Sequence, residues 1–188
     1  MLSEKLREET KQNHQLLEKK LVAFMRGIRS KEGYVQLLIL FYSFFGGLEL
    51  AIHAQLDHSQ LPDYKLRRKT AALAEDLVQF GKKLPLLACG TELPGINNHL
   101  QALGALYVIE GSTLGGAIIS KMIKQQLTIP DNKGLSFFNG YGEATEKMWR
   151  DFKLFLDGPL NPGGEAVVIQ SANDTFNKFR HWFDSRPL

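Results

Sequence analysis

A single histidine, His14, lies in the middle of residues 6–20, a stretch that otherwise has the composition of a surface helix. At 100° per residue, Leu17 falls on one side of His14, whereas Arg7 and Lys11 fall on the other. His14 therefore lies where an apolar helix face meets a cationic one. An imidazole in this position can bind a metal ion or can be a hydrogen-bonded core residue, and this segment alone favours the core residue.

A second helical pattern, residues 96–127, is interrupted by four glycines: Gly104, Gly111, Gly115 and Gly116. Each glycine inside a helix costs about 0.5–1 kcal/mol relative to alanine, so the four together cost ~2–4 kcal/mol of local stability. On a helical wheel, Gly104, Gly111 and Gly115 form one stripe without side chains, and Gly116 gives the backbone a place to bend. Such a stripe fits a close crossing of two helices, or a flat ligand that lies against bare backbone.

Taken together, His14 and the glycines favour a flat ligand. A planar, metal-bearing macrocycle needs an axial nitrogen on one face and clearance for a small diatomic molecule on the other. The carboxylates of such a macrocycle would be matched by Arg7 and Lys11, which precede His14 on its basic side.

The elements that must position these residues are predicted to be helices. The expected segments are residues 3–25 with Ser3 as N-cap, 31–56 with Ser30 as N-cap, 64–80 with Leu66, Leu73 and Leu77 on one face, 96–127, 143–156 and 165–183. No segment alternates with a period of two, and no repeat has a fixed period. We therefore expect an all-α fold, a multi-helix bundle that forms a single domain over residues 1–188.

The composition limits the class of partner. Of the 188 residues, 44% are hydrophobic and 23% are charged, which is typical of a globular protein. The net charge is only +3 and the basic residues alternate with acidic ones, so we expect a small anionic ligand and no nucleic acid. The most apolar run, residues 34–48, is too short to span a membrane and predicts a buried core helix. No membrane partner is expected.

The only cysteine, Cys89, excludes an intramolecular disulfide and indicates a reducing compartment. The first residues alternate acids and bases and do not have the pattern of a signal peptide. We therefore expect a cytoplasmic protein.

Several of these stretches resemble the heme oxygenase family. LREETKQNHQLLEK is similar to the family's proximal segment, FYSFFGGLELAIHAQL to its second helix, LYVIEGSTLGGAIISKMI to its distal helix, and GLSFF also recurs in the family. The pair Tyr141 and Gly142, with the later Trp149, Arg150 and Phe152, is most similar to the bacterial branch, which includes heme oxygenases associated with bacterial phytochromes. The likeness extends over residues 6–156 in the same order and spacing.

The resemblance implies a bundle of the heme oxygenase type that opens heme to biliverdin, CO and iron. Heme would be both substrate and cofactor, O₂ the oxidant, and an external donor such as ferredoxin or flavodoxin the source of electrons. The bilin product could pass to a phytochrome.

The resemblance also assigns roles to residues. His14 would be the axial ligand of the iron, and the distal side would consist of Gly111, Ser112, Gly115 and Gly116. The animal enzymes carry an aspartate where this chain has Ser112, so we expect Ser112, or a water that it holds, to deliver the proton. The candidates for binding the heme carboxylates are Arg7 and Lys11 first, followed by Tyr141, Lys147 and Arg150.

Other functions remain open. Ser112 in place of the acid favours a heme carrier or sensor that does not degrade its ligand. A thiaminase-like helical enzyme without heme would need Cys89 as nucleophile, but no base lies near it in the sequence. A di-iron carboxylate bundle is disfavoured because Glu49 and His53 are four residues apart and no Glu-x-x-His motif is present. Glu110, next to the glycines, is expected to be a buried hydrogen-bond partner, and the spacing does not identify the other group.

Overall fold

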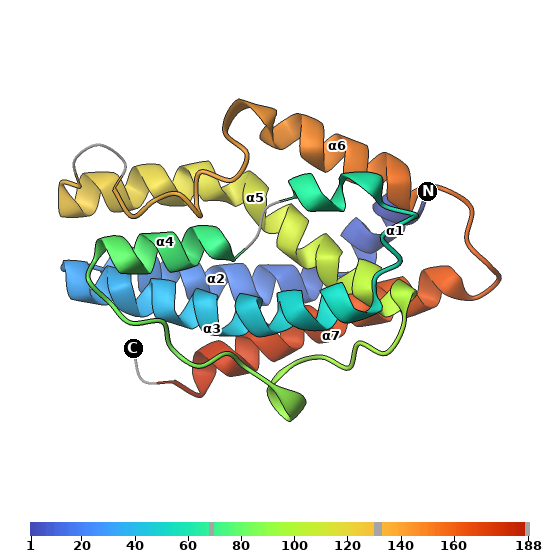
Figure 1. The fold of residues 1–188 in the computed structure, drawn as a ribbon, viewed down its shortest axis with the longest axis horizontal. Helices are drawn as coiled ribbons and strands as arrows, with labels where there is room; N and C mark the ends of the chain where they lie inside the picture. Colours follow the sequence, from blue (N-terminus) through green and yellow to red (C-terminus); the bar gives the residue numbers. More distant parts are fainter. Residues whose placement is uncertain (68–69, 130–132, 187–188) are drawn as a thin grey trace.

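The computed structural model describes residues 1–67, 70–129 and 133–186, and helices are the only regular elements in these ranges (Figure 1). The predicted all-α fold is confirmed. Seven α-helices follow one another, together with short 3₁₀ helices: α1 Leu2–Glu9, α2 Lys11–Gly27, α3 Lys31–Gln55, η1 Pro62–Leu66, α4 Ala71–Gln79, η2 Gly90–Glu92, α5 His99–Leu127, η4 Gly142–Ala144, α6 Thr145–Leu156 and α7 Gly164–Asp184.

The predicted first helix is divided into α1 and α2 at Thr10, whose hydroxyl donates a hydrogen bond to the Leu6 carbonyl at 2.6 Å. The prediction of Ser3 as N-cap is wrong, because Met1 occupies that position. Ser3 lies inside α1, and its hydroxyl donates to the Asp157 carboxylate at 2.8 Å. The N-terminal helix is thus tied to the end of α6 by a side chain that the sequence pattern had assigned to a cap.

Ser30 is the N-cap of α3 as predicted, since its hydroxyl oxygen accepts a hydrogen bond from the Gly33 N–H at 3.1 Å. The predicted 64–80 helix is only partly correct: η1 and α4 are separate, and residues 68 and 69 lie outside the described part of the chain. Leu73 and Leu77 are buried in α4, but Leu66 is 75% exposed. Leu66 belongs to the tighter 3₁₀ turn and does not share the apolar face of α4.

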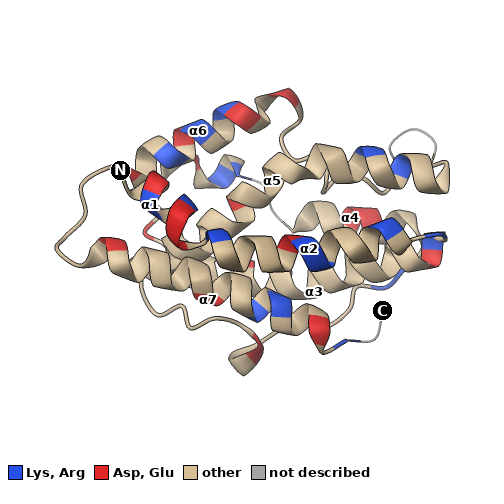
Figure 2. Cartoon of the chain, turned by 180° about the vertical axis from the view of Figure 1, so that it is seen from behind, with Lys and Arg blue, Asp and Glu red and all other residues tan. Residues whose placement is uncertain are grey.

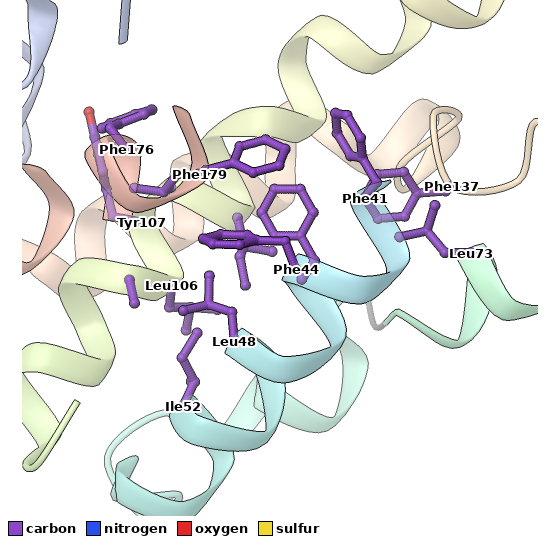
Figure 3. Packing of buried hydrophobic residues seen from close by; sticks show 14 of the residues in the cluster. Phe41, Phe44, Leu48, Ile52, Leu73, Leu106, Tyr107, Phe137, Phe176 and Phe179 are labelled. Atoms are coloured by element: carbon purple, nitrogen blue, oxygen red, sulfur yellow. The ribbon is translucent and has the colours of Figure 1, made fainter. Parts of the chain in front are cut away.

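The core is centred on α3, α5 and α7. Phe44 of α3 and Phe179 of α7 stack with ring centroids 4.8 Å apart, and Phe41 meets Phe179 edge-on (Figure 3). By length and composition, α3 and α5 could each cross a membrane, but 67% and 61% of their most apolar windows are buried inside the molecule. This burial is typical of core helices, as predicted for residues 34–48.

The closest approach of two helices occurs where α5 crosses α7. A Cβ atom on Gly104 would lie 2.3 Å from the Val168 carbonyl oxygen and 2.9 Å from the Ala172 nitrogen. Gly104 is therefore required for helix packing, and the close-crossing explanation holds at this position. The predicted glycine stripe does not extend to Gly104, because that face of α5 is covered by α7.

We predict that Gly104→Ala lowers the free energy of unfolding by about 1–3 kcal/mol, since the added methyl group overpacks the crossing against backbone atoms. Gly115→Ala is the matched control, because no atom lies within 4 Å of its Cβ position. This control should raise stability by about 0.5–1 kcal/mol through helix propensity. Urea unfolding of the heme-free protein measures both values, and equal effects of the two substitutions would contradict the assignment.

Candidate functional site

The helices α2 and α5 contact each other at two places, one near each end of α2. At one end, Tyr107 of α5 interacts with the side chain of Thr10, just before α2; burial raises the pKa of Tyr107, while Thr10 and the charge of Arg7 lower it to a lesser degree. At the other end, the Gln126 side-chain amide donates to the Arg26 carbonyl at 3.3 Å. Elsewhere α2 packs on α7, and α5 packs on α7 and α3. The two helices therefore share a neighbour, with direct contacts that fix their ends.

The path between these contacts is longer along α5 than along α2. Residues 107–126 span three more positions than residues 10–26, which corresponds to about 4–5 Å of additional helix. A bend of α5 is visible in Figure 1, and a bent helix accommodates this extra length between the two contacts. The view from behind in Figure 2 shows the middle of α5 running above α2.

Two hydroxyl groups at the bend hydrogen-bond to the helix backbone. The Ser112 hydroxyl donates to the Ile109 carbonyl, and the Thr113 hydroxyl donates to the Glu110 carbonyl, each at 2.6 Å. Bonds of this kind compete with the regular i to i−4 ladder and often bend a helix. The bend of α5 therefore has a local cause in the sequence, in addition to the glycines.

The three predicted distal glycines have different surroundings. A Cβ on Gly116 would lie 2.2 Å from the Phe138 carbonyl oxygen, so Gly116 lets the 133–142 segment approach the bend. A Cβ on Gly111 would lie 3.6 Å from the Trp149 ring of α6, an ordinary contact. No atom lies within 4 Å of the Cβ position of Gly115. Only Gly115 therefore presents bare backbone to open space.

His14 is exposed on α2 and is not a buried core residue. Its ring lies edge-on to Phe176 of α7, with centroids 5.6 Å apart. Within the described ranges the imidazole nitrogens have no hydrogen-bond partner, so they are available to a ligand. This arrangement removes the explanation of His14 as a satisfied core histidine.

The face of α5 that looks toward α2 is partly apolar and exposed. Gly115 and Ile118 lie within about 80° of Gln126 on the helical wheel, and Gln126 contacts α2. Ile118 is 74% exposed, although isoleucine is among the residues most often buried. An available imidazole on one helix and an apolar, glycine-containing face on the other fit a planar apolar molecule that carries a metal.

The cationic candidates lie on helices next to the Thr10 end. Arg7 and Lys11 are exposed, and the charge of Arg7 acts on Tyr107. Lys147 and Arg150 are exposed on α6, which packs on α5 through Trp149 and Tyr107, with ring centroids 5.4 Å apart. The Lys147 ammonium pairs with the Asp151 carboxylate at 2.6 Å. Figure 2 shows lysine and arginine positions on α6 and on the N-terminal helices.

Tyr141, the remaining candidate, is engaged elsewhere: its hydroxyl donates to the Glu110 carboxylate at 2.9 Å. The same carboxylate accepts a hydrogen bond from the Arg67 guanidinium at 2.9 Å, and the side chains of Arg67 and Glu110 are each only 1% exposed. Arg67 also binds Asp63 through two nitrogens. These contacts identify the partners of Glu110. One signal in the sequence pointed to a partner such as Arg67: the acidic Glu110 lies in an apolar helix and needs a cation.

The described residues do not contain the side-chain groups that a di-iron bundle or a thiaminase-like enzyme would need. No three histidine, cysteine, aspartate or glutamate side chains in those ranges are grouped as metal ligands, as a di-iron centre would need. Cys89 is exposed, and its backbone N–H donates to Glu92. Of the other histidines, His53 and His58 are exposed with tilted rings 4.7 Å apart, and His181 is exposed. The His99 Nδ1 accepts from the Asp57 N–H, and its buried Nε2 has no hydrogen-bond partner among the described residues.

We predict that Glu110→Ala lowers the free energy of unfolding by about 3 kcal/mol, because it leaves the buried Arg67 guanidinium without one of its partners. Glu92→Ala removes the same group from the exposed Arg186–Glu92 pair, whose atoms are also 2.9 Å apart. This control should change stability by less than about 1 kcal/mol. Both values come from urea unfolding, and a small effect of Glu110→Ala would show that water or Asp63 compensates.

Comparison with known proteins gives consistent matches over nearly the whole chain. Residues 1–185 match the family model described as heme oxygenase. The chain is 28% identical over 178 residues to heme oxygenase PigA of Pseudomonas aeruginosa, which covers 94% of this chain and 88% of that protein. It is 27% identical over 161 residues to a heme oxygenase of Xanthomonas campestris, with 84% and 92% covered. The fold is similar to the crystal structure of the NO- and CO-bound heme oxygenase of Neisseria meningitidis, with a TM-score of 0.82, 25% identity and coverage of 98% and 91%.

Proposed function

Because this chain belongs to the heme oxygenase family, we propose that heme is bound between α2 and α5, with His14 as the axial ligand and the bend of α5 over the opposite face. The protein is a heme oxygenase, an enzyme that cleaves heme to biliverdin, CO and iron with O₂ and reductant. The observations that carry the proposed site are the exposed imidazole of His14 on α2 and the exposed apolar side chains beside the open Gly115 on α5.

When bound, heme supplies the iron that binds O₂ and the ring that is opened. The contribution of His14 is a neutral imidazole nitrogen, and the edge of Phe176 limits the rotation of its ring. Ile118 and Leu114, which are 74% and 45% exposed, supply apolar contact for the macrocycle. Burial of these side chains against the ring favours binding by the hydrophobic effect.

The backbone of α5 around Gly115 leaves room for a diatomic ligand on the distal side. The Ser112 hydroxyl uses its hydrogen on the Ile109 carbonyl. In that orientation the Ser112 oxygen acts toward the site as an acceptor, so we propose that it positions a water molecule that delivers the proton. Gly111 and Gly116 let α6 and the 133–142 segment support the bend from outside.

The heme carboxylates are assigned to the Thr10 end of the site, where Arg7 and Lys11 are exposed and α6 contributes Lys147 and Arg150. Tyr141 is assigned to the support of Glu110, since its hydroxyl is bonded there.

The exposed cations at this end also suit an acidic electron-transfer protein, so we propose ferredoxin or flavodoxin as the donor. The likeness to bacterial enzymes supports a cytoplasmic protein that could supply bilin to a phytochrome.

We predict that His14→Ala abolishes turnover and changes the Soret absorption of the heme complex, because the axial nitrogen is lost. The assay is titration with hemin, followed by ascorbate or a ferredoxin system in air. The wild-type protein should lose its Soret band and release a green bilin. His181→Ala, which removes an exposed histidine of α7, is the control and should behave like wild type. An unchanged spectrum in His14→Ala would refute the axial assignment.

We predict that Gly115→Val lowers turnover about 10–100-fold while heme uptake changes little, because the two methyl groups fill the space for O₂ over the ring. Ala117→Val is the control, since it places the same valine side chain at an exposed position about 160° around α5. Heme affinity and single-turnover rates separate uptake from reaction. Wild-type rates in Gly115→Val would show that the distal face is not at this glycine.

A further inference from the structure

Glu110 lies where α5 changes from a core helix to a partly exposed one. Every residue from 102 to 110 is buried, whereas buried, half-buried and exposed residues alternate from Gly111 onward. The first part of α5 is held by α7 and α3, and the part after Gly111 contains the bend. Glu110 is therefore the last residue of the buried part of α5.

Glu110 is bonded to Arg67 and to Tyr141, which come from separate parts of the chain. Arg67 follows η1, where its guanidinium binds Asp63 through two nitrogens, and it lies 4.8 Å from the ring centroid of Phe152 in α6. Tyr141 comes from the segment that precedes η4. The start of the bend is therefore connected to η1, to α6 and to the 133–142 segment through one carboxylate.

The free energy of folding alone does not explain why Arg67 and Glu110 form a buried ion pair. The cost of removing both charges from water largely offsets their attraction, and apolar residues of similar volume are often at least as stabilising. An apolar pair would not fix the orientation of the two side chains. A guanidinium that is hydrogen-bonded to two carboxylates holds both carboxylates in a fixed geometry. The glycines and the hydroxyl-to-carbonyl bonds of Ser112 and Thr113 make the following turn soft, so an anchor before it determines its position.

We infer that Arg67 and Glu110 are positioning residues for the reaction. They fix the point at which α5 bends and thereby hold the backbone of residues 111–116 at a set height above α2. The inference rests on the proposed function of this space as the heme site. Both side chains are buried, each only 1% exposed.

The first test uses the heme-free protein and the double variant Arg67→Met with Glu110→Gln, which removes both charges and keeps an amide for Tyr141. Amide hydrogen exchange of residues 111–116 should be about tenfold faster than in wild type, because the turn is no longer fixed. Arg186→Met with Glu92→Gln makes the same change in an exposed pair and should leave that exchange unaltered.

The second test measures heme binding and single-turnover conversion. The same double variant should bind heme within about threefold of wild type but convert it about 10–100-fold more slowly, with a broader distribution of biliverdin isomers. Glu110→Gln alone keeps both hydrogen-bond partners and should recover part of the rate. Unaltered exchange at 111–116 together with a wild-type rate would overturn the inference.

Two further outcomes are distinguishable. If the double variant does not fold, Tyr141→Phe removes one bond to the same carboxylate, and its exchange at 111–116 should rise about two- to threefold; no change would overturn the inference. If wild-type protein does not bind heme, the proposed function fails, while the exchange results still decide whether Arg67 and Glu110 fix the bend.

Discussion

The separation of α2 and α5 between two fixed ends is the constraint on which the site depends. Tyr107 meets Thr10 at one end and Gln126 meets Arg26 at the other, and the stretch of α5 between them is longer. The bend of α5 lies between these two contacts (Figure 1). The available imidazole of His14 and the bare backbone at Gly115 are useful only because of this separation.

The glycines of α5 show that one residue type serves two needs within a single helix. Gly104 and Gly116 allow the backbone of another segment to approach, with carbonyl oxygens 2.3 and 2.2 Å from the Cβ positions. Gly115 faces open space instead. The stability lost through glycine is offset by packing at the first two positions, whereas no packing contact offsets it at Gly115.

Local patterns were enough to predict the all-α fold, the Ser30 cap and the position of His14 beside an apolar face, but not the breaks at Thr10 and between η1 and α4. They failed where long-range contacts decide: Ser3 binds Asp157 instead of capping α1, and the all-glycine stripe is divided by α7. The pairing of Glu110 with Arg67 joins residues 43 positions apart, so no local pattern could reveal it. The resemblance to the heme oxygenases supplied the family, and only the coordinates supplied the support of the bend.

The two ends of the α2–α5 pair are not equally strong. Thr10 and Tyr107 are buried, and burial excludes water that would compete for their interaction. At the far end, the contact is a hydrogen bond of 3.3 Å from the Gln126 side-chain amide to the Arg26 carbonyl, and it is exposed to solvent. Separation at that end costs less free energy than separation at Tyr107. The α2–α5 pair is therefore held by a buried contact beside Tyr107 and by a solvent-exposed contact beside Gln126, so water competes for the second contact and not for the first.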